Sequence, residues 1–381
     1  MEEKSMKKFL AAALSIAMVL SLAACGQQAA APAPAATEAA TQAAAPAATQ
    51  AAAAPAATEA PKTEAAAPAA PEKVYNWSLS TTYGTGTLIV EFFNRFADLA
   101  KEYTNGAINI TVYPDATIAG EDDAMAQVAS GELEMTATGT FAWKNYSPQY
   151  YWVAAPFFIT EATVWERMSN ESDLAQEQKK IWAEQYNTYA LGDCMFRGYR
   201  NLVCKKKISN VNDIKGVKVR MNTDPLWNAI WQSFGATTVP VALTELYTAL
   251  QTGVAEGCEN PLSESGSLNV PEVVDYVMAS NHMCDCTSIY MSYSAYQELS
   301  PELQEALTKA EKDAVAEYRP KVDDDMQKWI DVYKAAGCEY VADFDAQSFK
   351  DAAAPVYKEY FEKEWTGMSY DDALALLAQY E

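Results

Sequence analysis

Strand-like and helical segments alternate regularly between residues 74 and 254, and this alternation limits the possible folds more than any other feature of the chain. Segments 74–79, 108–113 and 133–137 have the composition and apolar pattern of strands. An amphipathic helix, with Gly106 as its stop, separates the first two. Because strands that alternate with helices form parallel sheets covered by helices, the sequence predicts an α/β fold.

The same alternation continues through the middle of the chain. We expect helices over residues 121–130, 162–186, 225–234 and 244–252. Strands are expected over residues 189–194 and 201–204, and near Val217, Val239 and Val254. A chain with this many alternating elements is large enough to divide into two lobes.

A long helix is predicted after Ser300. Ser300, Pro301 and Glu302 supply an N-cap, a proline at the first helical position and an acid near the positive end of the helix dipole. Apolar residues recur with helical spacing as far as Gly337, so the helix could brace two lobes. Pro320 should bend it, because proline removes one backbone hydrogen bond.

Residues 26–72 consist mainly of Ala, Pro, Thr, Gln and Glu, with repeated APAATEA and APAATQA units. The segment lacks aromatic and β-branched apolar side chains, so it cannot form a core. As a flexible coil it would span roughly 40 Å, and more if extended. We therefore expect a disordered linker, with the folded part confined to residues 73–381.

The N-terminus has the pattern of an export signal. Basic residues precede an apolar run over residues 9–20, which is too short to span a bilayer as a mature helix, and small residues lead to Cys25. The segment resembles a bacterial lipoprotein signal ending at residue 25, in which Cys25 is acylated and becomes the mature N-terminus. This predicts a lipid-anchored protein on the extracytoplasmic face of the cell membrane, whether translation starts at Met1 or Met6.

Charge is distributed unevenly along the chain. The formal net charge is −23, yet residues 197–220 contain eight Lys and Arg residues against one acid, Asp213. A local positive site suits the capture of an anion by an acidic protein, although solvated lysines on a surface strand would give the same pattern. Arg220 lies at the end of the strand-like segment 216–221, where ligands bind in α/β sheets, so we expect it to contact the anion.

Cysteine and histidine usage narrows the chemistry. Six cysteines follow Cys25, and an exported protein could pair them as disulfides, but their apolar surroundings favour buried thiols. His282 is the only histidine and no CxxC pair occurs, so neither a metal site nor a cofactor is expected. The basic stretch would lie outside the cell in an acidic chain, which argues against nucleic-acid binding.

Several short motifs point to a family because they occur in one order along the chain. The motifs are Gly198-Tyr-Arg200, Asn212-Asp-Ile-Lys-Gly-Val-Lys-Val-Arg220, Leu243-Thr-Glu-Leu-Tyr-Thr-Ala-Leu-Gln-Thr-Gly253 and Glu256-Gly-Cys-Glu-Asn260-Pro261. Together they resemble the extracytoplasmic solute-binding proteins of tripartite ATP-independent periplasmic (TRAP) transporters, the DctP-like family. The resemblance extends from residue 74 to about residue 355.

The resemblance implies a periplasmic-binding-protein-like α/β fold with two lobes, crossing strands and a long bracing helix. We expect residues 73–197 plus about 286–325 to form lobe I, and residues 198–285 plus about 326–381 to form lobe II. The lobes would close over an organic acid, which would then pass to the membrane subunits of a TRAP permease.

The resemblance also implies roles for individual residues. Arg220 matches the arginine that clamps the ligand carboxylate, and its fork of donors suits that group. Arg200 resembles a second cationic contact, and Asn260 matches a polar ligand-facing position. A surface-strand role for Arg200 and a turn role for Asn260 remain open. Further pocket-wall positions, each equally compatible with a core or loop role, are Tyr83, Thr140 and Leu243.

The expected function is therefore a membrane-tethered receptor for a small organic carboxylate, and not an enzyme. Two alternatives remain: a solute-binding lipoprotein of an ATP-driven importer, and a surface-anchored hydrolase. One histidine and no GxSxG motif leave little basis for hydrolysis. The ligand stays open among C4-dicarboxylates, 2-oxo acids, aromatic acids, sugar acids and sialic acid.

Overall fold

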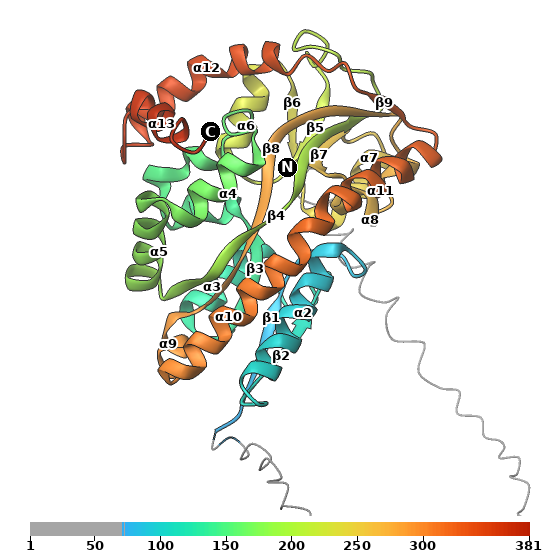
Figure 1. Ribbon diagram of the computed structural model, residues 1–381. Coiled ribbons are helices and arrows are strands. Elements are labelled where there is room, and N and C mark those ends of the chain that lie inside the picture. Colours follow the sequence, from blue (N-terminus) through green and yellow to red (C-terminus); the bar gives the residue numbers. More distant parts are fainter. Residues whose placement is uncertain (1–70, 72) are drawn as a thin grey trace, which may run out of the picture. The chain divides into compact units, whose positions relative to one another are not determined.

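The computed structural model describes residue 71 and residues 73–381 (Figure 1). The predicted signal peptide, Cys25 and nearly all of the predicted linker lie outside the described residues. Within the described part, no helix is both long and apolar enough to cross a membrane.

A single mixed sheet of nine strands runs through the folded part, in the order β2-β1-β3-β8-β4-β7-β5-β6, with β9 paired to β8. Two sets of parallel strands flank a central antiparallel pair. The strands are β1 (Tyr75–Ser80), β2 (Ile108–Tyr113), β3 (Met135–Gly139), β4 (Thr188–Cys204), β5 (Lys218–Met221), β6 (Thr237–Pro240), β7 (Gly257–Pro261), β8 (Tyr276–Ser292) and β9 (Glu339–Val341).

Strands β4 and β8 connect the two parallel sets. Each is 17 residues long, and the two are antiparallel to each other. β8 pairs with β3 at one end, whereas β4 pairs with β7 at the other. Both strands therefore cross from one set to the other, as Figure 1 shows at the centre of the molecule.

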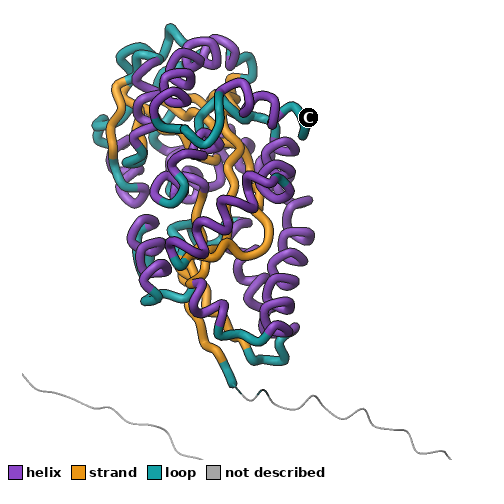
Figure 2. Tube along the Cα trace, turned by 90° about the vertical axis from the view of Figure 1, so that its left-hand side faces the viewer, coloured by secondary structure: helices purple, strands orange, loops and turns teal. Residues whose placement is uncertain are grey.

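Helices cover both faces of the sheet (Figure 2). In α2, for example, a fully buried stripe of Phe92, Phe93 and Phe96 packs into the main core. The α-helices are α2 (Leu88–Tyr103), α3 (Glu121–Ser130), α4 (Ala162–Glu171), α5 (Asp173–Tyr186), α6 (Pro225–Ser233), α7 (Leu246–Gln251), α8 (Leu262–Ser267), α9 (Tyr293–Gln297), α10 (Pro301–Tyr318), α11 (Val322–Ala335), α12 (Ala346–Lys363) and α13 (Tyr370–Leu377).

The predicted bracing helix is confirmed as α10 and α11, joined by the 3₁₀ turn η5 (Arg319–Lys321). Ser300 caps its start, where the hydroxyl accepts a hydrogen bond from the Leu303 amide at 3.4 Å. Pro320 lies in η5, at the position where a bend was expected. Helix α10 packs against α2 and β4, whereas α11 packs against α8 and β9. The long helix therefore contacts elements on both sides of the central strand pair.

The expected parallel strands are found on both sides of the sheet, whereas the crossing strands at its centre are antiparallel. β4 pairs antiparallel with both β7 and β8. Strand β8 was not predicted, because it is buried along most of its length and therefore lacks an alternating pattern. The strand expected near Val254 lies at Gly257–Pro261 instead, and Val254 itself is half exposed.

Two further boundaries differ from the prediction. The expected strands 189–194 and 201–204 are parts of one strand, β4, which continues through bulges where Gly192 and Gly198 adopt positive φ values of 62° and 112°. The expected helix 162–186 is broken at Ser172, whose hydroxyl accepts a hydrogen bond from the Ala175 amide and starts α5.

All six cysteines of the described part are buried and unpaired, as their apolar surroundings indicated. Burial raises the pKa of Cys258 to about 12, so this thiol remains protonated. These side chains therefore act as small apolar groups in the core.

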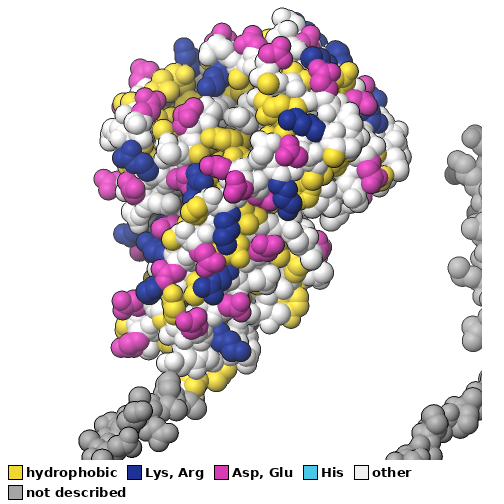
Figure 3. Space-filling view, turned by 45° about the vertical axis from the view of Figure 1, so that its right-hand side comes forward, with side chains coloured by type: hydrophobic (Ala, Val, Ile, Leu, Met, Phe, Trp, Pro, Cys, Tyr) yellow, Lys and Arg dark blue, Asp and Glu magenta, His cyan; other side chains and the backbone are white. Residues whose placement is uncertain are grey.

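On the face shown in Figure 3, basic and acidic side chains are interspersed with apolar patches. The basic stretch of residues 197–220 divides by depth. Its lysines are exposed or half-buried, whereas Arg197, Arg200 and Arg220 are buried. The arginine charges of this stretch therefore lie inside the protein, and its lysine charges lie at or near the surface.

Candidate binding site

All six predicted ligand-site residues line one cavity between the two sets of parallel strands. Tyr83 and Thr140 come from the β1–β3 side, and Arg220 and Asn260 come from β5 and β7. The cavity is small, about 30 Å³, which leaves room for only a few water molecules. A solute could enter only if the walls moved apart. The cavity is lined by Tyr83, Glu121, Gly139, Thr140, Phe141, Arg197, Arg200, Arg220, Asn222, Trp227, Leu243, Asn260, Glu264 and Asp285.

Arg220 occupies the third position of β5 and is 3% exposed. Its Nε donates a hydrogen bond to the carbonyl oxygen of Val241 at 2.8 Å. Among the described residues, no acceptor or acidic partner is recorded for its two terminal nitrogens. Burial lowers the pKa of Arg220, but a guanidinium remains protonated at neutral pH. The cavity therefore contains a positive charge that the described part of the protein does not neutralise.

Asn260 lies beside this charge in the sheet. Arg220 pairs with Cys258 on the neighbouring strand β7, and Asn260 is two residues further along the same strand face. Its Oδ1 is buried and has no hydrogen-bond partner in the described structure. Since an unmet acceptor at a buried site is costly, this oxygen is available to a donor group on a ligand.

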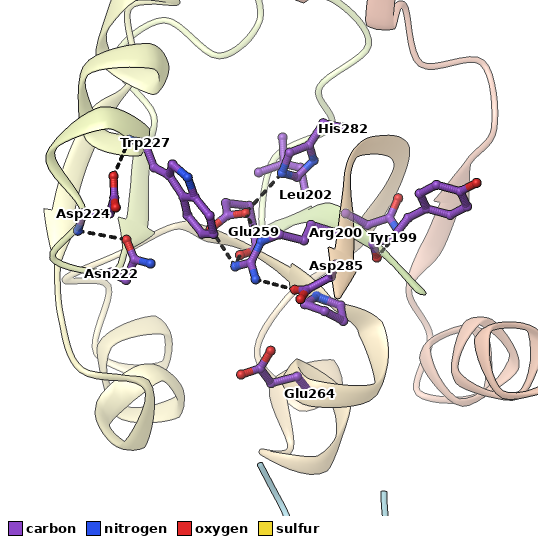
Figure 4. Close-up of polar contacts among 12 residues, drawn as sticks. Tyr199, Arg200, Leu202, Asn222, Asp224, Trp227, Glu259, Glu264, His282 and Asp285 are labelled. Atoms are coloured by element: carbon purple, nitrogen blue, oxygen red, sulfur yellow. Dashed lines mark hydrogen bonds and ion pairs between the residues drawn. The ribbon is translucent and has the colours of Figure 1, made fainter. Parts of the chain in front are cut away.

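Arg200 lines the cavity but is already neutralised (Figure 4). Its Nε and Nη2 donate to the two carboxylate oxygens of Glu259 at 2.7 and 2.9 Å. Its Nη1 donates to Asp285 at 2.7 Å, and the guanidinium lies 4.7 Å from the ring centroid of Trp227. Arg200 therefore has a fixed position, with most of its donors occupied.

A second buried layer holds Glu259. His282, the only histidine, lies with Nε2 3.1 Å from a Glu259 oxygen and Nδ1 3.0 Å from the Ser280 hydroxyl. Burial lowers the pKa of His282, so the neutral ring donates from Nε2 to the carboxylate. Burial opposes ionisation of Glu259, but the charge of Arg200 and these hydrogen bonds hold its pKa at about 2.

Arg197 is a cavity residue to which the sequence assigned no role. Its Nη2 donates to Glu264 at 3.0 Å, and its Nε and Nη2 donate to Asp285 at 3.1 Å each. The guanidinium also lies 4.1 Å from the ring centroid of Tyr83. Residues three apart on a regular strand face opposite sides, but the bulge at Gly198 brings Arg197 and Arg200 to the same cavity.

Glu121 is a second residue that the sequence did not identify. It begins α3 and accepts a hydrogen bond from the Thr138 hydroxyl at 3.2 Å. Burial and the negative charge of Glu264 raise the pKa of Glu121 to about 7. The remaining predicted residues, Thr140 at the start of the 3₁₀ turn η1 and Leu243 at the start of η3, form parts of the wall.

The described residues contain no group of three or more His, Cys, Asp or Glu side chains that could hold a metal ion. The arrangement instead offers groups that suit an anion. It combines one free guanidinium, an unpaired amide oxygen and two arginines held in ion pairs.

Comparisons with known proteins show which proteins the chain is similar to. The chain is 26% identical over 276 residues to the 2,3-diketo-L-gulonate-binding periplasmic protein YiaO of Escherichia coli, covering 71% of this chain and 82% of that protein. It is 22% identical over 273 residues to the C4-dicarboxylate-binding periplasmic protein DctP of Rhodobacter capsulatus, covering 71% of this chain and 81% of that protein.

The fold matches a crystal structure of a TRAP periplasmic solute-binding protein from a Polaromonas species bound to D-erythronate. The TM-score is 0.73 at 22% identity, and the match covers 80% of this chain and 98% of that one. The family model DctP, described as bacterial extracellular solute-binding protein, family 7, matches residues 79–364. This family consists of binding proteins and not enzymes, in accordance with the prediction from the sequence. The chain belongs to the DctP family of bacterial extracellular solute-binding proteins.

Proposed function

We propose that this protein is a tethered receptor that binds a small organic carboxylate and delivers it to the membrane subunits of a TRAP-type transporter. The observation that carries the proposal is the buried guanidinium of Arg220, which lines the cavity without an acidic partner in the described structure. A carboxylate would supply the missing negative charge and accept two parallel hydrogen bonds.

The neighbouring groups fit a carboxylate at this position. Asn260 offers an amide nitrogen to a carboxylate oxygen and an unpaired Oδ1 to a hydroxyl group of the same ligand. Arg200 is held by Glu259 and Asp285, so it contributes a fixed wall and few free donors. Arg220 therefore provides the main attraction, and its fork orients the ligand.

We propose that binding closes two lobes over the ligand, with lobe I comprising residues 73–197 plus about 286–325 and lobe II residues 198–285 plus about 326–381. Tyr83 and Thr140 lie in the first of these, and Arg220 and Asn260 in the second. Ligand contacts to both sides would shift the population toward the closed form. The small cavity supports this reading, because a solute could reach Arg220 only while the two sides of the cavity were apart.

We further propose that Cys25 is acylated and that residues 26–72 link it to the folded part. The sequence pattern supports this proposal, and a diacylglyceryl cysteine would hold the protein on the membrane. Expression of the full chain followed by detergent phase partitioning tests it. The wild type should enter the detergent phase and Cys25→Ser the aqueous phase; equal partitioning of the two would refute acylation.

Isothermal titration calorimetry with a panel of organic acids tests the binding function. At least one carboxylate should bind the wild type, and Arg220→Ala should lose that binding. Delivery to a TRAP permease is tested in proteoliposomes that contain the membrane subunits, where uptake should require both this protein and a sodium gradient. Uptake that instead requires ATP would favour the alternative of an ATP-driven importer.

A further inference from the structure

The three arginines of the cavity differ in how far their charges are balanced. Arg197 is paired with Glu264 and Asp285, and Arg200 with Glu259 and Asp285. All three carboxylates are buried, with 7%, 4% and 1% of their surfaces exposed for Glu264, Asp285 and Glu259. These contacts bind two arginines to three carboxylates, whereas no ion pair of the described residues involves Arg220.

We infer that this cavity selects acids with a single carboxylate and rejects dicarboxylates. The inference rests on the proposed function, because it assumes that Arg220 holds one carboxylate. A second carboxylate would find no cation left to neutralise it: Arg197 and Arg200 are the remaining arginines of the cavity, and each already contacts two acids.

Displacing one of these acids would not help a second carboxylate. If Glu264 or Asp285 gave up its arginine, it would remain as a buried, unpaired charge, which is strongly unfavourable. If it stayed, the incoming carboxylate would lie beside a negative charge in a water-poor site. Either route penalises a dianion and leaves a monoanion unaffected.

The part of the cavity lined by Arg197 and Glu264 is better suited to hydroxyl groups. Glu264 uses only Oε2 toward Arg197, so no partner is recorded for its Oε1 in the described structure. Arg197 likewise has no recorded acceptor for Nη1. One group accepts and the other donates, which is the pattern that an alcohol satisfies. The favoured ligand is thus a hydroxylated monocarboxylic acid.

Family membership alone leaves this choice open. Of the relatives described above, one is named for C4-dicarboxylates and one structure contains D-erythronate, a four-carbon acid with one carboxylate. The difference between these ligand classes is a terminal carboxylate in place of a terminal alcohol. The acids paired with Arg197 disfavour a terminal carboxylate but not a terminal alcohol.

Pairs of acids with equal chain length and matching configuration provide the test: D-galactonate against galactarate, and D-erythronate against meso-tartrate. Each pair differs only in the terminal group, so calorimetry at pH 7.5 isolates the second charge. For the wild type we expect the monoanion of at least one pair to bind, and to bind at least about 100-fold more tightly than its dianion. Equal or tighter binding of the dianion would overturn the inference.

The variant Glu264→Gln tests the cause, because it keeps the shape of the side chain and removes one charge that neutralises Arg197. The ratio of the affinity for the monoanion to the affinity for the dianion should fall at least about tenfold. The matched control, Glu305→Gln on the exposed surface of α10, should keep the wild-type ratio. An unchanged ratio in Glu264→Gln would refute the assigned mechanism.

These outcomes separate the two proposals. A dianion that binds tightly to the wild type and is lost in Arg220→Ala contradicts the selectivity and leaves the receptor function intact. If no monocarboxylate or dicarboxylate of the wider panel binds the wild type, the receptor function itself fails, and the selectivity fails with it.

Discussion

Substitution of Arg220 separates ligand binding from stability in a way that few positions allow. The guanidinium is 3% exposed and its terminal nitrogens have no recorded acceptor in the described structure. Removing one partner of a buried hydrogen-bonded charge pair costs about 2–5 kcal/mol of binding. For Arg220→Met we expect a loss of ~3 kcal/mol, which corresponds to more than about 100-fold in affinity. Arg220→Lys should recover only part of this affinity, because lysine keeps the positive charge but lacks the planar fork of donors.

The same substitution should not destabilise the protein in the absence of ligand. Arg220→Met removes a buried charge whose only recorded hydrogen bond is to Val241, so the melting temperature should stay equal or rise. Arg200→Met is the matched control. It strands Glu259 and Asp285 without their cation and should lower the free energy of unfolding by about 3–5 kcal/mol.

Thermal denaturation followed by circular dichroism measures the stability of both variants, and calorimetry measures their affinity for the best acid of the panel. The expected pattern is a stable Arg220→Met that does not bind and an unstable Arg200→Met. If Arg220→Met bound the acid within a few-fold of the wild type, the role of Arg220 as the carboxylate clamp would be refuted. If Arg220→Met melted several degrees below the wild type, the inference that the terminal nitrogens of Arg220 have no partner in the protein would be contradicted.

Three further predictions follow from buried groups. The pKa of Glu259, held at about 2, lies below its ordinary value of 4.5, so its ionised form contributes stability above pH 4.5 that is lost as the pH falls toward 2. Urea unfolding of Glu259→Gln should show a stability loss on the order of 3 kcal/mol at neutral pH that disappears at the acidic end; a constant difference would contradict it. The pKa of Glu121 is raised to about 7, so its ionisation in the folded state costs stability as the pH rises from 4.5 to 7. Glu121→Gln should flatten that part of the stability profile, and an unaltered slope would count against the raised pKa. Gly198→Ala places a side chain at φ 112° within 3.1 Å of Met326, and should cost about 1–3 kcal/mol in the same assay; a neutral result would show that the bulge tolerates a side chain.

The elements with a clear periodic pattern could be predicted from the sequence. The helix over Glu121–Ser130 was predicted with its observed limits, since its apolar positions face one side and Gly131 ends it in the left-handed conformation. Strand β8 escaped prediction for the opposite reason. It is buried along most of its length, so its polar and apolar residues do not alternate with exposure.

The site could be predicted only in part. The order of short motifs indicated Arg220 and Asn260, which the structure places on adjacent parallel strands. Arg197 could not be assigned, because its direction depends on a bulge that the spacing of residues does not reveal. Glu264 and Asp285 were missed because they lie far apart in the sequence and meet only through the fold.

The uncompensated guanidinium of Arg220 also has a consequence for the surroundings in which the receptor works. Chloride, formate or phosphate outside the cell would each be drawn to the same nitrogens and would compete with the nutrient. The concentration of organic acid needed for half-saturation would then rise with the concentration of these ions. The rise would be steepest for ions small enough to enter the cavity. The salinity of the habitat would thereby set the working sensitivity of uptake, without any change in the amino-acid sequence.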